Sequence, residues 1–145
     1  MQYVFSTTQT KRYRFPTHIN DLVMDRSQAA TSEVFIVVLA PGEAPPMHKH
    51  DDTEQVFYVL TGRGHLEIGG EKRRFSVAPG DAVRIPPRKP HRIFCEGRKP
   101  LVYLAVDCFL KGRPKAEPTW DAHVKGNCRK FGWSFKAVTG GRGAK

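Results

Sequence analysis

Short apolar segments separated by proline and glycine turns fill residues 33–110. The segment 33–40 is rich in β-branched residues and ends at a Pro-Gly pair, and segment 55–60 ends at a Thr-Gly pair. The series closes with the long apolar segment 101–109, and few residues before it recur at helical spacing. Many short strands divided by turns are typical of a sandwich or barrel. The sequence therefore predicts an all-β core over residues 33–110.

An apolar stripe at helical spacing appears after this predicted barrel. It predicts a short helix over about residues 119–131, with Thr119 as its N-cap. Gly126 in the middle of the segment disfavours a helix by about 1 kcal/mol relative to alanine. We expect the stripe to pack against the barrel, and its members are Trp120, Val124, Cys128 and Phe131.

The positive charge of the chain is concentrated in the residues that follow the predicted barrel in the sequence. The formal net charge is +10, and residues 111–145 hold 9 basic and 2 acidic residues, which accounts for +7. These basic residues are scattered, so we expect a solvated surface and no nucleic-acid partner. We divide the chain into N-terminal strands or an arm over residues 1–32, a barrel core over 33–110 and a basic C-terminal extension over 111–145.

The cysteines and the apolar segments indicate the compartment. Three cysteines at wide spacing exclude a disulfide scaffold and a CxxC zinc module, and they suit a reducing environment. No segment approaches the roughly 20 apolar residues of a membrane span, and the first residues do not resemble a secretory signal. We therefore expect a cytoplasmic protein with no membrane partner.

Three histidines form a pattern suited to metal binding. His48 and His50 lie two residues apart, so on a strand both side chains project from the same face. His91 begins a later strand, directly after a proline-rich turn. Imidazoles beside an oxygen donor form a ligand set for Fe, Mn, Ni, Zn or Cu. We therefore predict one divalent transition metal ion per chain.

Two longer motifs around these histidines resemble those of the cupin superfamily, in particular its small single-domain bacterial-type barrels. The motifs are Gly42-x5-His48-x-His50-x4-Gln55-x6-Gly62 and Gly80-x5-Pro86-x-Arg88-x2-His91-x3-Cys95, separated by 17 residues. In the second motif Arg88 stands where the family usually has Gly, and Cys95 stands where it usually has Asn. The resemblance implies a double-stranded β-helix, or jelly-roll cupin barrel, with a short C-terminal helix. It also implies that the three histidines of these motifs are metal ligands.

The fourth ligand position has two candidates, Glu54 and Gln55. Neighbours on a strand point to opposite faces, so only one of them joins the histidines. Six residues separate Gln55 from Gly62, as in the family pattern, and some similar cupins use Gln here; we favour Gln55 and keep Glu54 as the alternative. Three neutral imidazoles and an amide leave the ion with its full +2 charge, which favours an anionic ligand.

We interpret the chain as a metal-dependent enzyme that acts on a small polar or anionic metabolite by dioxygenase-, isomerase- or lyase-type chemistry. Arg84 and Tyr58 are candidate substrate contacts, and the pattern assigns no catalytic residue beyond the ligands. The alternative is a non-catalytic ligand-binding or sensing cupin with a structural metal. A third hypothesis with less support is nucleic-acid association through residues 111–145.

Two further expectations concern the partner chain and the remaining histidines. The resemblance implies a homodimer in which strands from residues 2–14 join the sheet of the partner. His18, His65 and His123 have no ligand-like neighbours in the sequence. We expect His123 to lie on the surface of the C-terminal helix.

Overall fold

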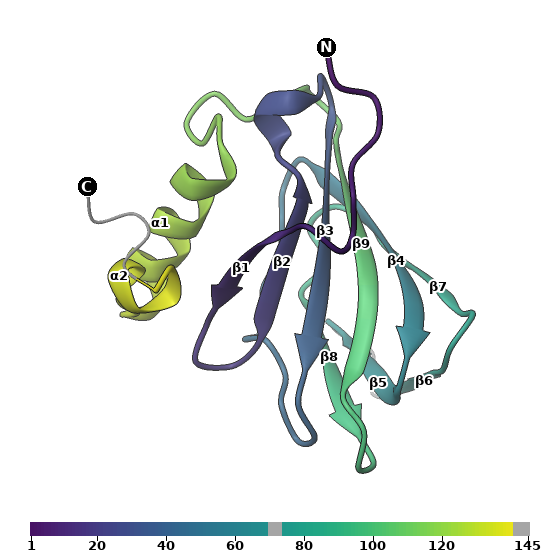
Figure 1. The fold of residues 1–145 in the computed structure, drawn as a ribbon. Helices are drawn as coiled ribbons and strands as arrows, with labels where there is room; N and C mark the ends of the chain where they lie inside the picture. The colour runs from purple at the N-terminus through teal and green to yellow at the C-terminus, as the bar shows by residue number, and fades with distance from the viewer. Residues whose placement is uncertain (70–73, 141–145) are drawn as a thin grey trace.

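The computed structural model describes residues 1–69 and 74–140, and it is built mainly from β-strands (Figure 1). The strands are β1 (Lys11–Arg14), β2 (Ile19–Met24), β3 (Ser32–Leu39), β4 (Thr53–Thr61), β5 (Arg63–Ile68), β6 (Phe75–Val77), β7 (Ala82–Ile85), β8 (His91–Glu96) and β9 (Leu101–Phe109). A 3-10 turn, η1 (Arg26–Gln28), follows β2, and two helices, α1 (Trp120–Phe131) and α2 (Phe135–Val138), follow β9.

The strands form two antiparallel sheets. A six-stranded sheet has the order β1-β2-β3-β9-β4-β7, and a three-stranded sheet has the order β6-β5-β8. The strand order mixes distant segments, as expected for a jelly roll, since β9 lies between β3 and β4. The predicted all-β barrel with a short C-terminal helix is confirmed.

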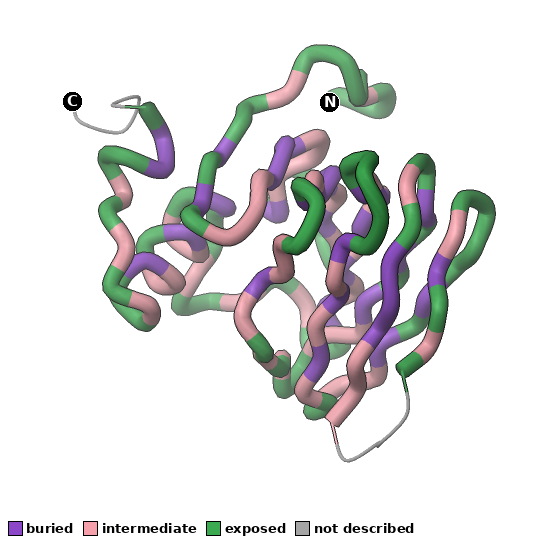
Figure 2. The backbone as a smooth tube through the Cα atoms, turned by 90° about the horizontal axis from the view of Figure 1, so that it is seen from below, coloured by how far each residue is buried: buried purple, intermediate pink, exposed green. Residues whose placement is uncertain are grey.

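Alternation along the central strands places one face of each in the core. In β4 the buried side chains are Gln55, Phe57 and Val59, and in β9 every second residue from Leu101 to Phe109 is buried. This period of two is what a strand produces when one of its faces packs inside the barrel and the other faces outward. Figure 2 shows the resulting alternation of buried and less buried positions along the strands.

The C-terminal helices lie beside the β1 edge of the large sheet (Figure 1). The Thr119 hydroxyl accepts a hydrogen bond from the Ala122 amide at 3.1 Å, as predicted for an N-cap, and Gly132 ends α1 in the left-handed conformation. Trp120 is 2% exposed and packs on Phe35, with 4.8 Å between the ring centroids. In the part of the chain that the structure describes, no helix has the length and apolar character needed to cross a membrane.

Candidate metal centre

The two sequence motifs meet through a short backbone bridge. The His48 amide donates to the His91 carbonyl at 3.2 Å, and the His91 amide donates back to the His48 carbonyl at 2.9 Å. The Arg88 amide also donates to the His50 carbonyl at 2.7 Å. These bonds bring the three imidazoles together, and one nitrogen from each lies within 4.8 Å of the others. The predicted histidine cluster is therefore assembled by backbone contacts between the two motifs.

The hydrogen bonds of the imidazoles leave suitable lone pairs for a metal ion. Nδ1 of His48 lies 2.7 Å from the Pro46 carbonyl, and Nδ1 of His91 lies 2.9 Å from the Lys89 carbonyl. A carbonyl only accepts hydrogen bonds, so each Nδ1 carries the proton and each Nε2 keeps its lone pair. Nε2 of His91 is buried without a hydrogen-bond partner among the described residues. This is the arrangement that metal-binding histidines adopt.

Burial keeps these histidines neutral. It lowers the pKa of His48 below its ordinary value and lowers the pKa values of His50 and His91 to about 3. A neutral imidazole is the form that binds a metal ion. The cluster is therefore ready to bind a metal ion at neutral pH without first losing protons.

Gln55 lies in the cavity with the histidines, whereas Glu54 points outward. Nε2 of Gln55 donates to Oδ1 of Asp107 at 2.7 Å, and Oε1 of Gln55 is buried with no partner in the described part of the chain. Glu54 forms an ion pair with Arg84 at 3.3 Å on the outer face of the sheet. The geometry therefore places Gln55 in the cavity of the histidines and turns Glu54 away from it.

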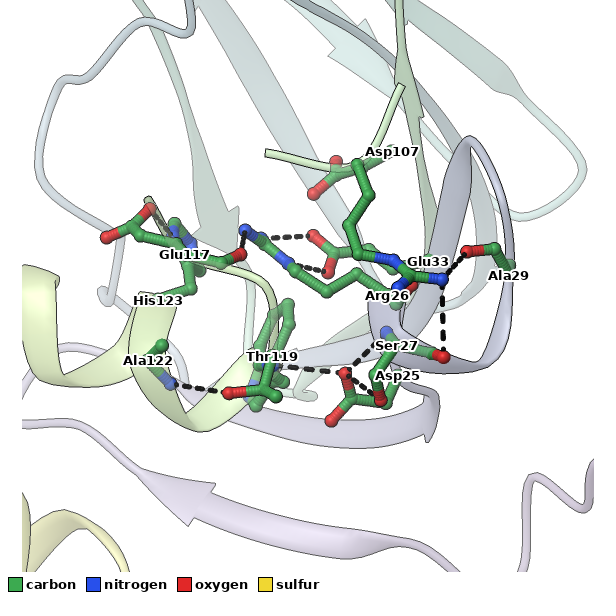
Figure 3. Close-up of polar contacts among 12 residues, drawn as sticks. Asp25, Arg26, Ser27, Ala29, Glu33, Asp107, Glu117, Thr119, Ala122 and His123 are labelled. Atoms are coloured by element: carbon green, nitrogen blue, oxygen red, sulfur yellow. Dashed lines mark hydrogen bonds and ion pairs between the residues drawn. The ribbon is translucent and has the colours of Figure 1, made fainter. Parts of the chain in front are cut away.

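A buried polar chain behind Gln55 fixes its amide. Glu33, Asp107 and Gln55 face one another in register across β3, β9 and β4. Glu33 also forms a two-bond ion pair with Arg26, at 2.7 and 2.9 Å (Figure 3). Burial, together with the adjacent Asp107 carboxyl, raises the pKa of Glu33 to about 9. The sequence analysis did not predict this row of buried polar side chains behind Gln55.

The three histidines open into a cavity of about 260 Å³ that is closed on one side by α1. The barrel contributes aromatic walls, and the helix with its flanking segments contributes both polar and aromatic side chains. The aromatic lining residues are Phe15, Phe35, Phe57, Tyr103, Trp120, Phe131 and Trp133, and the polar residues from the C-terminal extension are Glu117, His123, Asn127 and Lys130.

His123 is not a surface residue, so that expectation is wrong. Its side chain is 17% exposed and lines the cavity. His123 lies three residues after the buried Trp120 and four before Asn127, which places all three on one side of the helix. The apolar stripe predicted that α1 packs on the barrel, but it carried no information on which part of the barrel the helix covers.

The structure does not place Arg84 and Tyr58 beside the histidines. The Arg84 side chain is 68% exposed, and Tyr58 is 48% exposed. Because Gln55 faces inward on β4, Tyr58 three positions later faces outward, and Arg84 pairs with the outward Val56. The expected position of these two side chains at a substrate bound to the metal centre is therefore not observed.

Arg88 preserves the turn of the second motif despite replacing the usual glycine. Its φ of 64° lies in the left-handed region, where a side chain costs roughly 1–2 kcal/mol. The backbone bond from Arg88 to His50 lies in this turn. Arg88 therefore adopts, at an energetic cost, a backbone conformation that glycine adopts freely.

Comparison with known proteins agrees with this architecture. The cupin domain profile matches residues 35–107, and the chain belongs to the cupin family. It is 39% identical over 67 residues to the protein MJ1618 of Methanocaldococcus jannaschii, covering 46% of this chain and 52% of that protein. It is also 30% identical over 92 residues to quercetin 2,3-dioxygenase of Bacillus subtilis, covering 63% of this chain and 27% of that protein.

A solved structure shows the same fold over most of the chain. The predicted oxalate decarboxylase of Thermotoga maritima superposes with a TM-score of 0.66 at 20% identity, covering 74% of this chain and all of that one. In contrast, the matched segments span about half of the first curated relative and about a quarter of the second. The family profile runs from β3 to β9 and includes the three histidines, and α1 lies outside it.

Proposed function

We propose that this cupin is a metal-dependent enzyme that binds one divalent transition metal ion, Fe, Mn, Ni, Zn or Cu, through His48, His50, His91 and Gln55. The observation that carries the proposal is the pair of unpartnered buried atoms, Nε2 of His91 and Oε1 of Gln55, in one cavity. An unpaired buried polar atom costs about 1–3 kcal/mol, and a bound ion would remove that cost. The ion would supply Lewis-acid polarisation of substrate oxygens.

The substrate that suits this cavity is a small polar or anionic organic molecule. The proposed ligand set contains no carboxylate, so the charge of the ion stays uncompensated and favours an anion. Lys49 and Lys130 also line the cavity. The volume of about 260 Å³ lies at the small end of the range for ligand pockets. The chemistry we propose is of dioxygenase, isomerase or lyase type, and the similarity to quercetin 2,3-dioxygenase supports an enzyme.

Metal analysis of untagged protein tests this proposal. We expect about one transition metal ion per chain after purification or reconstitution, and a lower melting temperature after chelation. His91→Ala should lose the ion, whereas Glu54→Ala, which changes the outward neighbour of Gln55, should keep it. Protein that binds no stoichiometric metal and is unaffected by chelators would contradict the proposal. A bound metal with no effect of Gln55→Ala would remove Gln55 from the ligand set.

The charge argument has its own test, with oxalate as the anionic probe. Gln55→Glu adds a negative charge beside the ion, so we expect oxalate to bind at least about tenfold more weakly to the metal-loaded variant. Equal affinity of wild type and variant would contradict the preference for anions. The alternative function is a non-catalytic ligand-binding or sensing cupin with a structural metal. A protein that binds both the metal and oxalate but catalyses no reaction would correspond to it.

Two expectations from the sequence stay predictions. These are the homodimer formed through residues 2–14 and the cytoplasmic location. Size-exclusion chromatography with light scattering tests the homodimer. It compares the molar mass of the full chain with that of a variant that lacks residues 1–10.

A further inference from the structure

The proposed ligand set has no group that can move a proton. It consists of three neutral imidazoles and an amide, and each of the dioxygenase, isomerase and lyase reactions needs a proton acceptor for a substrate O–H or C–H. Asp107 reaches the cavity, but its carboxyl already accepts the hydrogen bond from Nε2 of Gln55. The remaining candidates lie on the opposite wall, which is formed by α1 and the segment before it.

On that wall an imidazole and a carboxylate form a pair. Nδ1 of His123 lies 3.1 Å from Oε1 of Glu117, the contact drawn in Figure 3. The hydrogen bond lowers the pKa of Glu117, so its carboxylate is ionised and accepts the Nδ1 proton. Nε2 of His123 then keeps its lone pair, with Nδ2 of Asn127 at 3.4 Å as its neighbour. All three side chains line the cavity of the metal centre.

Two features of the structure fix the position of Glu117. Nη1 of the buried Arg26 donates to the Glu117 carbonyl at 3.0 Å (Figure 3). A Cβ at Gly126 would lie 2.3 Å from Oε2 of Glu117, so the carboxylate occupies space that any other residue at this helix position would fill. A glycine inside a helix reduces its stability relative to alanine. Here it makes room for the carboxylate that contacts His123.

Charged and titratable side chains from several elements surround this pair. The charged and titratable groups around His123 are Glu117 on the preceding segment, Lys130 on α1, His48 and His50 on the barrel and Arg26 in η1.

We propose that His123 is the proton-transferring residue of this site and that Glu117 is its positioning residue; the inference rests on the proposed function. A substrate O–H or C–H bond breaks, the proton goes to Nε2 of His123, and the electron pair stays on the substrate as an anion. The imidazolium that forms keeps its Nδ1–H bond to the Glu117 carboxylate, which stabilises the added charge. The proton returns to the product or leaves to solvent.

Proton counting with acetohydroxamic acid tests this without knowledge of the substrate. This probe binds metal ions as an anion after losing its O–H proton. Calorimetry of zinc-loaded protein at pH 7.5, in buffers of different ionisation enthalpy, measures how many protons reach the buffer per probe bound. We expect His123→Gln to release more protons than wild type, because the proton that His123 keeps in wild type goes to the buffer in the variant. Any proton taken up by hydroxide displaced from the zinc is the same in both proteins and cancels in this difference.

Two variants separate positioning from a merely structural contact. Glu117→Gln removes the charge that stabilises the imidazolium, and Gly126→Ala displaces the carboxylate while favouring the helix. Both should release more protons than wild type, and Gly126→Ala should do so with an unchanged or higher melting temperature. His65→Gln is the matched control, because His65 also pairs with a carboxylate, Glu96, but does not line the cavity. Its proton count should equal that of wild type.

The outcomes distinguish the two proposals. Zinc-loaded His123→Gln that binds acetohydroxamate with the proton count of wild type overturns the role of His123 and leaves the metal site standing. If His123→Gln changes the number of protons released but neither Glu117→Gln nor Gly126→Ala does, the role of Glu117 is overturned. A wild-type protein that binds no zinc, or binds zinc but no acetohydroxamate, overturns the proposed function and this inference together.

Discussion

Gln55 takes its orientation from side chains on neighbouring strands. The count of residues in the first motif predicted Gln55 in preference to Glu54 as a ligand, and strand alternation explains why Gln55 faces the cavity while Glu54 faces outward. The same local pattern could not show that Asp107 and Glu33 lie beside Gln55, because that depends on the register between distant strands. At the scale of residues, the sequence predicted the proposed ligands but did not predict that Asp107 and Glu33 lie beside Gln55.

Asp107→Asn tests this support at the same scale. The variant removes the carboxylate that orients the Gln55 amide, while Glu33 can still pair with Arg26 as an ionised group, so we expect a folded protein. Loss of such an outer contact typically lowers metal affinity by about 10- to 100-fold. Competition for zinc with a chromophoric chelator measures the change, and Glu54→Gln is the control. Wild-type zinc affinity in Asp107→Asn would show that Gln55 needs no such support.

Helix α1 combines a predicted element with an unpredicted position. The stripe and the N-cap residue were sufficient to place the helix, since both are local signals. Its docking site depends on the fit of Trp120 against Phe35 and Tyr13, which belong to β3 and β1. Helical periodicity shows which face is apolar but not which surface covers it. His123 was therefore assigned to the surface although it lies against the cavity.

Trp120→Ala tests how firmly α1 is held. The side chain is 2% exposed, and truncation of a buried tryptophan costs about 3–5 kcal/mol of unfolding free energy. Urea denaturation followed by circular dichroism measures the loss. The matched control is Lys125→Ala on the exposed side of the same helix, which removes only the stacking of its ammonium over the Phe135 ring and should cost no more than about 1 kcal/mol. A loss below about 1 kcal/mol in Trp120→Ala would mean that the helix docks weakly.

The stability of the whole molecule should depend on pH in both directions. Burial lowers the pKa values of His18, His50 and His91 to about 3, so the folded state binds fewer protons than the unfolded state between about pH 3 and 6.5, and stability falls as pH falls through this range. The raised pKa of Glu33, about 9, has the opposite sign. It removes stability as pH rises from about 4.5 to 9. The three histidines outweigh Glu33 below pH 6.5.

We therefore expect the metal-free protein to be most stable near pH 6.5. Urea denaturation at intervals from pH 4 to 9 measures this profile. Glu33→Gln should flatten the alkaline side and leave the acid side unchanged, because it removes only the group with the raised pKa. Stability that increases between pH 7 and 9 would contradict the raised pKa of Glu33.

Helix α1 closes the cavity from outside the segment that matches the cupin family. The proposed metal ligands and the wall opposite them therefore belong to separate stretches of chain, which are joined by the packing of Trp120 on Phe35 and by the bond from Arg26 to the Glu117 carbonyl. We expect that exchanging the segment after β9, with these contacts kept, would change the reaction and leave the histidines in place. Similarity confined to the barrel carries no information about that wall, so relatives with the same histidines need not share a substrate. Chimeras that exchange only this segment offer a direct way to redirect the chemistry of such a barrel.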